Sequence, residues 1–360
     1  MSGIRCRRSI GLIAVIAVSL WPAYAQPGKD ATVTNAPDLR DSIPQTISPE
    51  ARAIYQKLLP VVAARRGQQK IPQTLADFDA NYAEVQARAV AQTAPLLKML
   101  GVTVTDMRLG DVGVLETRPP NYQDDGTVLI RVHGGGFVQD SARSSAAGDA
   151  LMAISTGKRI LSVDYTVAPR GKWPLVTDQV IAVYKAALAQ GYQPQSVGFF
   201  GDSAGGNIVP ASILKLRDKG LPLPGAVVLL SPCVDLHLNG DTETTLANAD
   251  PALDAEHVVP GLKAYADPAD WNNPYVSPIY GDFKKGFPPL LIQVGTKEFL
   301  LSDSVRLYQA VKVAGGTAEL DVYEGMTHVF QSYMMNTPEQ KAAYAEMKSF
   351  WARNLHPTKR

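Results

Sequence analysis

The sequence predicts an α/β protein built on a mostly parallel, doubly wound sheet. From about residue 100 onward, short apolar runs typical of buried strands alternate with helical patterns. One such run, 196–200, leads into Gly201-Asp-Ser-Ala-Gly-Gly206, where a serine lies between a strand and a helix and is flanked by small residues. A second glycine-rich motif, His133-Gly-Gly-Gly-Phe137, follows another predicted strand. Because ligands bind at the carboxyl ends of strands in such sheets, both motifs are expected at one functional edge.

The composition is that of an ordinary globular protein. The chain has 360 residues, of which 46% are hydrophobic and 19% charged, so it can bury a large core. Its formal net charge of +1 gives no reason to expect nucleic acid as a partner. Cys233 follows an apolar strand and is expected to be a small buried side chain rather than a reactive one.

The first 25 residues have the pattern of a secretory signal peptide. Arg5, Arg7 and Arg8 precede the apolar run 10–20, and Ala23-Tyr-Ala25 matches a cleavage site. The apolar run is shorter than the about 20 residues that a membrane anchor needs. We therefore expect cleavage near Ala25, export to the periplasm or the medium, and no stable membrane anchor afterwards.

Residues 26–100 are expected to form a leader and N-terminal helices, and residues 101–360 the main α/β domain. The helical pattern begins at Ser48-Pro-Glu50, where Ser48 is a suitable N-cap, and a second helix starts near Leu75. Eight strands are expected at 102–108, 112–117, 127–132, 159–164, 196–200, 225–230, 289–294 and 318–323. Helices are expected at 143–156, 176–190, 204–218, 302–314 and 337–354. The first two strands are predicted to be antiparallel edge strands, and the stretch from 231 to about 287 to be irregular.

Ser203 is the candidate nucleophile. A tight strand-to-helix turn holds its hydroxyl out at the sheet edge, but a serine hydroxyl needs a base, and the base needs an orienting acid. His328 lies five residues after the last predicted strand, on the loop at its carboxyl end, from which a base can reach Ser203. The other histidines lie in the glycine run, beyond a Ser-Pro turn, in the irregular stretch and in the tail: His133, His237, His257 and His356.

The orienting acid is expected between Ser203 and His328 in the sequence, after the preceding strand. Glu298 lies in the loop four residues beyond that strand and is the favoured candidate. Asp303 is the alternative. Its position at the start of the next helix is also explained by the helix dipole, which favours an acidic residue there.

The glycine run is explained either by a simple turn or by a close approach of the backbone to a ligand. We expect the amides of Gly134 and Gly135, together with that of Ala204, to form an oxyanion hole for a substrate carbonyl. A phosphate loop is disfavoured because neither glycine cluster is followed by Lys-Ser or Lys-Thr, and Gly-x-Gly-x-x-Gly does not occur. No Cys/His grouping has metal-ligand spacing, so no metal or cofactor is expected.

Residues 125–335 resemble the hormone-sensitive-lipase group of α/β-hydrolases, the bacterial family IV or GDXG esterases. Besides the two glycine motifs, four segments carry the resemblance: Asp164-Tyr-Thr-Val-Ala-Pro169, Ser231-Pro-Cys-Val-Asp-Leu236, Ser277-Pro-Ile-Tyr-Gly-Asp282 and Glu324-Gly-Met-Thr-His-Val-Phe330. The resemblance implies an α/β-hydrolase fold with Ser203 as nucleophile, His328 as base, and an oxyanion hole of the Gly134, Gly135 and Ala204 amides. It also implies a helical cap made of the N-terminal helices and residues 240–275.

The chain departs from the family pattern at two places. The family usually has Asp where Glu298 stands, and after Ala168-Pro169 it commonly has an acidic residue and then His, whereas Arg170 and Gly171 follow here. The first departure bears on the identity of the acid. The second changes the packing near the site.

These features predict an exported, cofactor-independent serine carboxylesterase that hydrolyses small, short-acyl esters through an acyl-enzyme. A lactone hydrolase or deacetylase would use the same triad. A hypothesis of a different class is a catalytically dead hydrolase scaffold that binds a small molecule, but the nucleophile, base and oxyanion glycines are all present. The expected partner is a small-molecule ester, and the oligomeric state, including a homodimer, is left open.

Overall fold

The computed structural model describes residues 38–357, except 67–69, 252 and 254. The chain divides into two units, residues 1–34 and 35–360, and all described residues belong to the second. The predicted signal peptide, its cleavage position at Ala25 and most of the predicted leader lie outside the described residues. In the described part of the chain, no helix is both long and apolar enough to cross a membrane.

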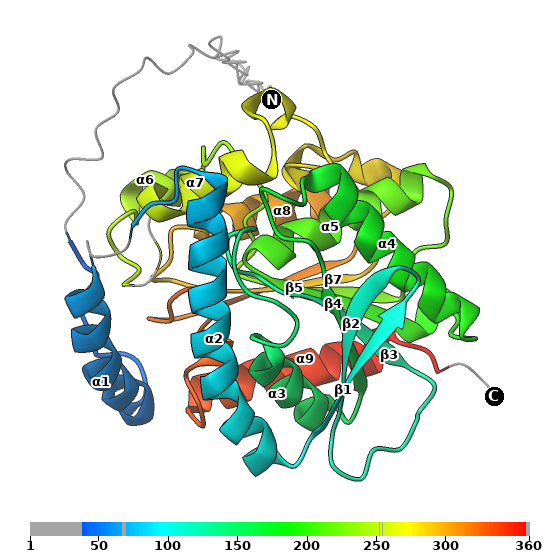
Figure 1. Ribbon diagram of the computed structural model, residues 1–360, viewed down its shortest axis with the longest axis horizontal. Coiled ribbons are helices and arrows are strands. Elements are labelled where there is room, and N and C mark those ends of the chain that lie inside the picture. Colours follow the sequence, from blue (N-terminus) through cyan, green and yellow to red (C-terminus); the bar gives the residue numbers. More distant parts are fainter. Residues whose placement is uncertain (1–37, 67–69, 252, 254, 358–360) are drawn as a thin grey trace, which may run out of the picture. The chain divides into compact units, whose positions relative to one another are not determined.

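A single eight-stranded sheet forms the centre of the second unit, in the order β1-β2-β4-β3-β5-β6-β7-β8 (Figure 1). The pairs β1–β2 and β2–β4 are antiparallel, and all other neighbours are parallel. The strands are β1 Thr103–Leu109, β2 Val112–Arg118, β3 Val128–Val132, β4 Arg159–Asp164, β5 Val197–Asp202, β6 Ala226–Leu230, β7 Leu290–Gly295 and β8 Ala318–Tyr323. The mostly parallel sheet predicted from the sequence is confirmed. One detail was wrong: β1 is an edge strand, but β2 is interior because it pairs with both β1 and β4.

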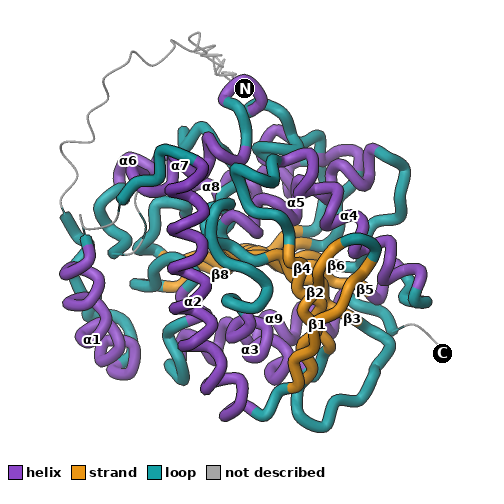
Figure 2. Tube along the Cα trace, viewed as in Figure 1, coloured by secondary structure: helices purple, strands orange, loops and turns teal. Residues whose placement is uncertain are grey.

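Helices cover both faces of the sheet. They are α1 Pro49–Arg65, α2 Leu75–Leu100, α3 Ala146–Thr156, α4 Trp173–Ala189, α5 Ala204–Asp218, α6 Asp241–Thr245, α7 Ala255–Tyr265, α8 Leu301–Val313 and α9 Pro338–Asn354. Figure 2 shows α4 and α5 on one side of the strands and α3 and α9 on the other. The β3 side chains alternate between the two sides: Ile130 belongs to the core under α4, α5 and α8, and Leu129 to the core under α3 and α9.

The sequence predicted an irregular stretch after β6. This prediction was wrong in part, because the stretch contains the helices α6 and α7. These helices give a weak sequence signal. The first spans five residues, and the second contains Pro260 and Gly261, two residues of low helix propensity. Tertiary contacts hold the second: the Tyr265 ring stacks on Phe137 with centroids 4.2 Å apart.

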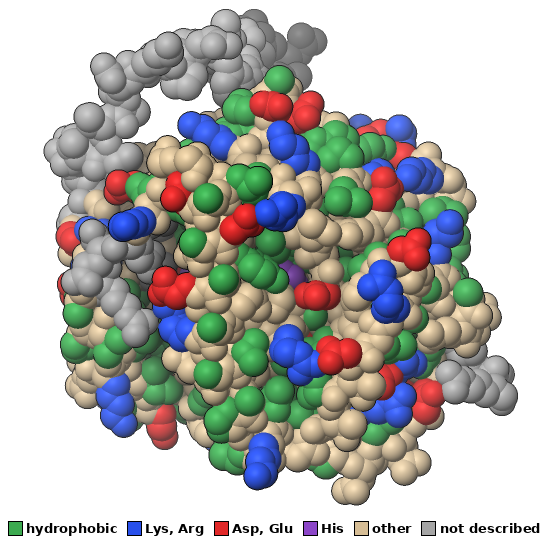
Figure 3. All heavy atoms as spheres, in the orientation of Figure 1, with side chains coloured by type: hydrophobic (Ala, Val, Ile, Leu, Met, Phe, Trp, Pro, Cys, Tyr) green, Lys and Arg blue, Asp and Glu red, His purple; other side chains and the backbone are tan. Residues whose placement is uncertain are grey.

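The first N-terminal helix begins at the predicted cap, and the second begins at a cap that was not predicted. The Ser48 side chain accepts a hydrogen bond from the Ala51 amide, and Thr74 forms a capping box with Asp77. On the face drawn in Figure 3, acidic and basic side chains are interspersed, which agrees with the small net charge of the chain.

Candidate active site

Ser203 lies in the sharp turn between β5 and α5. Its backbone has φ 53° and ψ −118°, a conformation that non-glycine residues adopt only where the surrounding structure enforces it. The flanking glycines permit this turn. A Cβ on Gly201 would lie 2.5 Å from the Gly205 carbonyl oxygen, and one on Gly205 would lie 2.1 Å from the Val132 carbonyl oxygen. Larger residues at either position would push β5, α5 and the end of β3 apart.

The glycine run lies directly against this turn. A Cβ built on Gly134 would be 3.1 Å from the Ser203 Cβ, and Gly135 has φ +95°. Among the described residues, no hydrogen bond occupies the backbone amides of Gly134 or Gly135. Ala204 is the first residue of α5, so its amide is one of the N–H groups without an intrahelical partner. The structure therefore brings the three predicted oxyanion residues close to the serine.

His328 and Glu298 form a hydrogen-bonded pair. Glu298 Oε2 is 3.0 Å from His328 Nδ1, while Oε1 accepts hydrogen bonds from the Gly295 amide at 2.6 Å and the Ser231 hydroxyl at 2.9 Å. The glutamate is fully buried. Its carboxylate is thus fixed by two further donors and presents one oxygen to the imidazole.

The end of β6 connects this pair to the serine. The Ser203 amide donates to the Leu230 carbonyl at 2.9 Å, and the Val329 amide donates to the Ser231 hydroxyl at 3.1 Å. Ser203 and Val329, the residue after His328, are therefore held by two consecutive residues, Leu230 and Ser231. The loop is also held by Asp250, which accepts a hydrogen bond from the His328 amide at 2.7 Å.

The pKa of His328 is raised above its ordinary value of 6.5. Burial by itself lowers this pKa, but the hydrogen bond and negative charge of Glu298, helped by Asp250 and Asp202, outweigh the burial. The imidazolium is consequently stabilised where it would form after the imidazole takes a proton.

Asp303 has a different position from Glu298. Its Oδ2 accepts hydrogen bonds from the amides of Val234 at 2.6 Å and Asp235 at 3.1 Å, and it lies in the first turn of α8. Arg306 Nη1 is 3.5 Å from its other oxygen. These contacts fix the loop after β6, and the described hydrogen bonds of Asp303 do not include His328.

Among the described side chains, those of His133 and His237 do not join this group. His133 is fully buried, its Nδ1 is 2.9 Å from the Gly134 carbonyl oxygen, and its ring stacks on Tyr165 at 4.2 Å. The Tyr165 hydroxyl donates to the His133 carbonyl at 3.0 Å, so both rings fix the glycine run. His237 contacts Trp271 edge-on, and the side chain of His257 lies outside the described atoms. Cys233 is buried, as expected.

The N-terminal segment binds the acid and histidine loops from outside. Lys297 Nζ donates to the carbonyls of Leu39 at 2.8 Å and Ser42 at 2.6 Å, and the Tyr55 hydroxyl of α1 donates to the Gly325 carbonyl at 2.7 Å. Sequence reasoning missed this role because the contacts span more than 250 residues. Ser231 and Tyr165 fall within segments that carried the family resemblance, whereas Asp250 gave no signal at all.

Two helices contact the loops around the glycine run, which is where the predicted cap would lie. The α2 helix contacts the 141–146 segment, because Gln86 accepts from the Ser141 hydroxyl at 2.6 Å. The α7 helix lies against the glycine run, since a Cβ on Gly261 would be 2.3 Å from the Gly136 carbonyl oxygen. The divergent Arg170 forms a two-pronged contact with Asp79 of α2, at 3.0 and 2.6 Å. That these helices act as a cap remains a prediction.

Known proteins resemble the chain over most of its length. A family model described as alpha/beta hydrolase fold matches residues 129–332. An esterase of Acinetobacter venetianus is 34% identical over 224 residues, 62% of this chain and 74% of its own, and an acetyl-hydrolase of Streptomyces hygroscopicus is 34% identical over 221 residues, 61% and 74%. The crystal structure of esterase E25 matches with a TM-score of 0.81 and 29% identity, covering 87% of this chain and 96% of its own. An esterase of the bacterial hormone-sensitive lipase family matches with a TM-score of 0.74 and 32% identity, covering 86% and 99%. The chain therefore belongs to the α/β-hydrolase family, resembles its hormone-sensitive-lipase esterases, and is a carboxylic ester hydrolase.

Proposed function

We propose that the protein is an exported serine carboxylesterase that hydrolyses small, short-acyl esters through a covalent acyl-enzyme. Ser203 is the nucleophile, His328 the general base, Glu298 the orienting acid, and the amides of Gly134, Gly135 and Ala204 the oxyanion hole. The observation that carries the proposal is the 3.0 Å contact between the buried Glu298 carboxylate and His328 Nδ1. This contact fixes the imidazole with Nε2 free to accept a proton.

In the first half-reaction, the Ser203 oxygen attacks the ester carbonyl carbon while its proton passes to His328 Nε2. The carbonyl oxygen becomes negatively charged and accepts hydrogen bonds from the three amides, each worth about 3 kcal/mol of transition-state stabilisation by analogy with other oxyanion holes. As the tetrahedral intermediate collapses, the bond between carbonyl carbon and alcohol oxygen breaks. His328 returns the proton to the alcohol, leaving an acyl group on Ser203.

The second half-reaction uses the same groups in the same order. His328 takes a proton from a water molecule, whose oxygen attacks the acyl carbon, and then protonates Ser203 Oγ as the acyl bond breaks. Ester and water are consumed, and a carboxylic acid and an alcohol are released. Base catalysis of this kind contributes roughly 10²–10⁴-fold to the rate. Glu298 stabilises the imidazolium.

A series of p-nitrophenyl esters from acetate to decanoate tests this function. We expect turnover that is fastest for acetate to butyrate, and that falls to near background in Ser203→Ala. Ser349→Ala is the matched control, because Ser349 lies on α9 and bonds only to Arg353 among its described contacts. Full activity in Ser203→Ala, or no turnover by folded wild-type protein, would refute the serine esterase proposal. A maximum at decanoate would refute only its short-acyl part.

Export is tested separately from activity. Full-length protein produced in a bacterial host with an outer membrane should be recovered from the periplasm or medium with an N-terminus at Gln26, as read by mass spectrometry. Recovery of uncleaved chain in the cytoplasm would contradict the proposed signal peptide.

A further inference from the structure

A cavity of about 210 Å³ adjoins the proposed nucleophile, on the side of the sheet covered by α3 and α9. Its wall includes Asp202, the residue before Ser203, and Val329, the residue after His328. Met152 of α3 and Tyr344 of α9 also line it. We call this cavity the polar pocket. Neither Ser203 nor His328 lines it, but its wall lies beside the serine, because a Cβ built on Gly134 would be 2.6 Å from Asp202 Oδ2 and 3.1 Å from the Ser203 Cβ. The cavity has room for a small substituent of a substrate.

The wall of the polar pocket carries an ion-paired guanidinium. Arg131 of β3 donates through Nη2 to Asp202 at 2.8 Å and through Nη1 to Asp149 at 2.9 Å and to the Ser145 carbonyl at 2.6 Å. The Arg131 side chain is only 8% exposed. An unpaired charge at that depth is strongly unfavourable, so the guanidinium stays committed to these acceptors and is not free to bind a substrate carboxylate.

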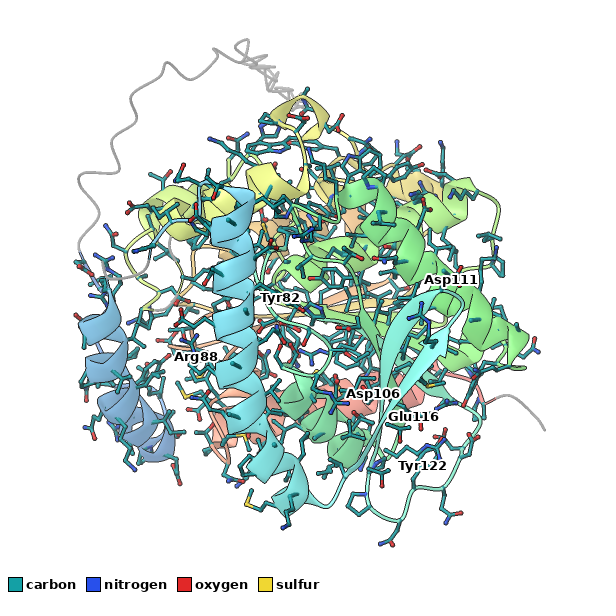
Figure 4. All side chains as sticks on the ribbon, in the orientation of Figure 1. Tyr82, Arg88, Asp106, Asp111, Glu116 and Tyr122 are labelled. Atoms are coloured by element: carbon teal, nitrogen blue, oxygen red, sulfur yellow. The ribbon has the colours of Figure 1, made fainter. Side chains whose placement is uncertain are left out.

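A further carboxylate faces the polar pocket. Asp140 lines its wall and lies in the loop beneath α2, where Ser144 donates a hydrogen bond to it at 3.2 Å. Figure 4 labels Tyr82 on the side of α2 that faces the strands, and burial, with the charges of Asp164 and Asp140, raises the pKa of this tyrosine. The wall therefore holds one cation, Arg131, against the two carboxylates Asp140 and Asp202. The excess negative charge favours hydrogen-bond donors and cations and disfavours anions.

The position of the polar pocket relative to His328 identifies which half of the ester enters it. The alcohol oxygen must receive its proton from His328, whereas the carbonyl oxygen points toward the glycine amides. Val329, Gln331 and Ser332, which come directly after this histidine, line the polar pocket. These lining residues favour the alcohol half, which must lie beside His328, as the part of the ester that enters the polar pocket.

We propose that the polar pocket binds the alcohol half of the ester and selects alcohols that carry a hydroxyl or a cationic group over apolar and carboxylate-bearing ones. This inference rests on the proposed esterase function and specifies its substrate class. A hydrogen bond to a charged partner predicts a preference of roughly tenfold in kcat/KM for a hydroxyl over a methyl group of similar size.

Four acetates test the proposal by pH-stat: propyl acetate, 2-hydroxyethyl acetate, which matches it in size, and the larger acetylcholine and 3-acetoxypropanoate. We expect kcat/KM to be roughly tenfold higher for the hydroxyethyl ester than for the propyl ester. The choline ester should also exceed the propyl ester, and the carboxylate ester should be the poorest. Asp140→Asn should reduce both preferences severalfold, because it removes one charge but keeps an acceptor for Ser144. Asparagine also suits the backbone of Asp140, which has φ +64°.

The control variant is Asp267→Asn, which removes the charge of a 75% exposed carboxylate far along the chain, and it should leave the preferences unchanged. Equal rates for the propyl and hydroxyethyl esters, or preferences that survive in Asp140→Asn, would overturn the proposal. A hydroxyl preference found instead in the acyl half, with ethyl 3-hydroxybutanoate favoured over ethyl pentanoate, would overturn the assignment to the alcohol. Loss of p-nitrophenyl acetate turnover in the wild type would refute the esterase function itself, so the two failures are distinguishable.

Discussion

Replacing Glu298 by Gln changes one heavy atom of the site and tests whether the carboxylate of Glu298 sets the tautomer of His328. In the wild type, Oε1 accepts from the Gly295 amide and the Ser231 hydroxyl, and Oε2 faces His328 Nδ1. Glutamine offers one acceptor oxygen and one NH₂ donor. Because two donors already require the oxygen, the NH₂ group must face Nδ1. The imidazole then has to accept at Nδ1 and carry its proton on Nε2, so it cannot take the proton of Ser203.

The expected loss of kcat follows from this tautomer. The equivalent acid-to-amide change in a Ser-His-Asp protease lowers kcat by about 10⁴ through the same wrong tautomer, so we expect a loss of about 10³–10⁴ in Glu298→Gln. KM should change little, since the acid does not touch the substrate. The fold should persist, because the side-chain shape and all three hydrogen bonds are kept, one of them with donor and acceptor exchanged. The free energy of unfolding should fall by only about 1–3 kcal/mol.

The matched comparison is Asp303→Asn, measured by p-nitrophenyl acetate turnover together with thermal unfolding of each variant. An asparagine oxygen can still accept from the Val234 and Asp235 amides, so kcat should stay within about tenfold of the wild type. If Asp303→Asn abolishes turnover in folded protein while Glu298→Gln retains it, the assignment of Glu298 as the acid is refuted.

Three further predictions concern pH and the N-terminal segment. First, kcat/KM should fall with decreasing pH along a limb centred above 6.5, because Glu298 raises the pKa of His328 and only the neutral imidazole is a base; a limb below 6.5 in the pH–rate profile would contradict this. Second, burial and the charge of Glu243 raise the pKa of Asp303, so its protonated form stabilises the fold below about pH 4 and this stabilisation is lost as pH rises. In urea unfolding, the free energy of unfolding of Asp303→Asn should therefore rise relative to that of the wild type between pH 4 and 8. A constant difference between the two proteins would argue against this prediction. Third, Lys297→Met removes the hydrogen bonds to residues 39–42 beside Glu298 and should lower the free energy of unfolding by about 1–3 kcal/mol; unchanged thermal unfolding would show that these contacts contribute nothing.

The elements that sequence reasoning placed well are those with strong local signals. Buried parallel strands such as β3 and β6 are continuous apolar runs, and α5 follows a glycine-flanked serine, so both kinds of element are legible over short windows. The α7 helix was missed because Pro260 and Gly261 weaken its local signal, while its stability comes from packing against the glycine run. Local propensity carries no information about such a partner.

The residues of the candidate site also fall into two groups: those that local motifs predicted, and the acid, which depends on contacts between distant parts of the chain. Motif order and spacing pointed to Ser203, His328 and the glycine run, because each follows a strand whose carboxyl end lies at one edge of a parallel sheet. The choice between Glu298 and Asp303 depends on which carboxylate oxygen reaches an imidazole about 30 residues away in sequence, and here the structure places Glu298 at 3.0 Å.

By itself, the sequence determined the fold class, the order of strands along the chain and the candidate side chains for ester hydrolysis. Only the tertiary structure decided which groups lie together: the ring of contacts around Glu298, the support of its loop by residues 39–42, and the pairing of Arg131 with Asp149 and Asp202 beside the serine. The physical reason is the distance along the sequence over which each kind of interaction acts. Strand, helix and turn preferences act over a few residues, whereas hydrogen bonds and buried charges connect residues that only the folded backbone brings within 3 Å of each other.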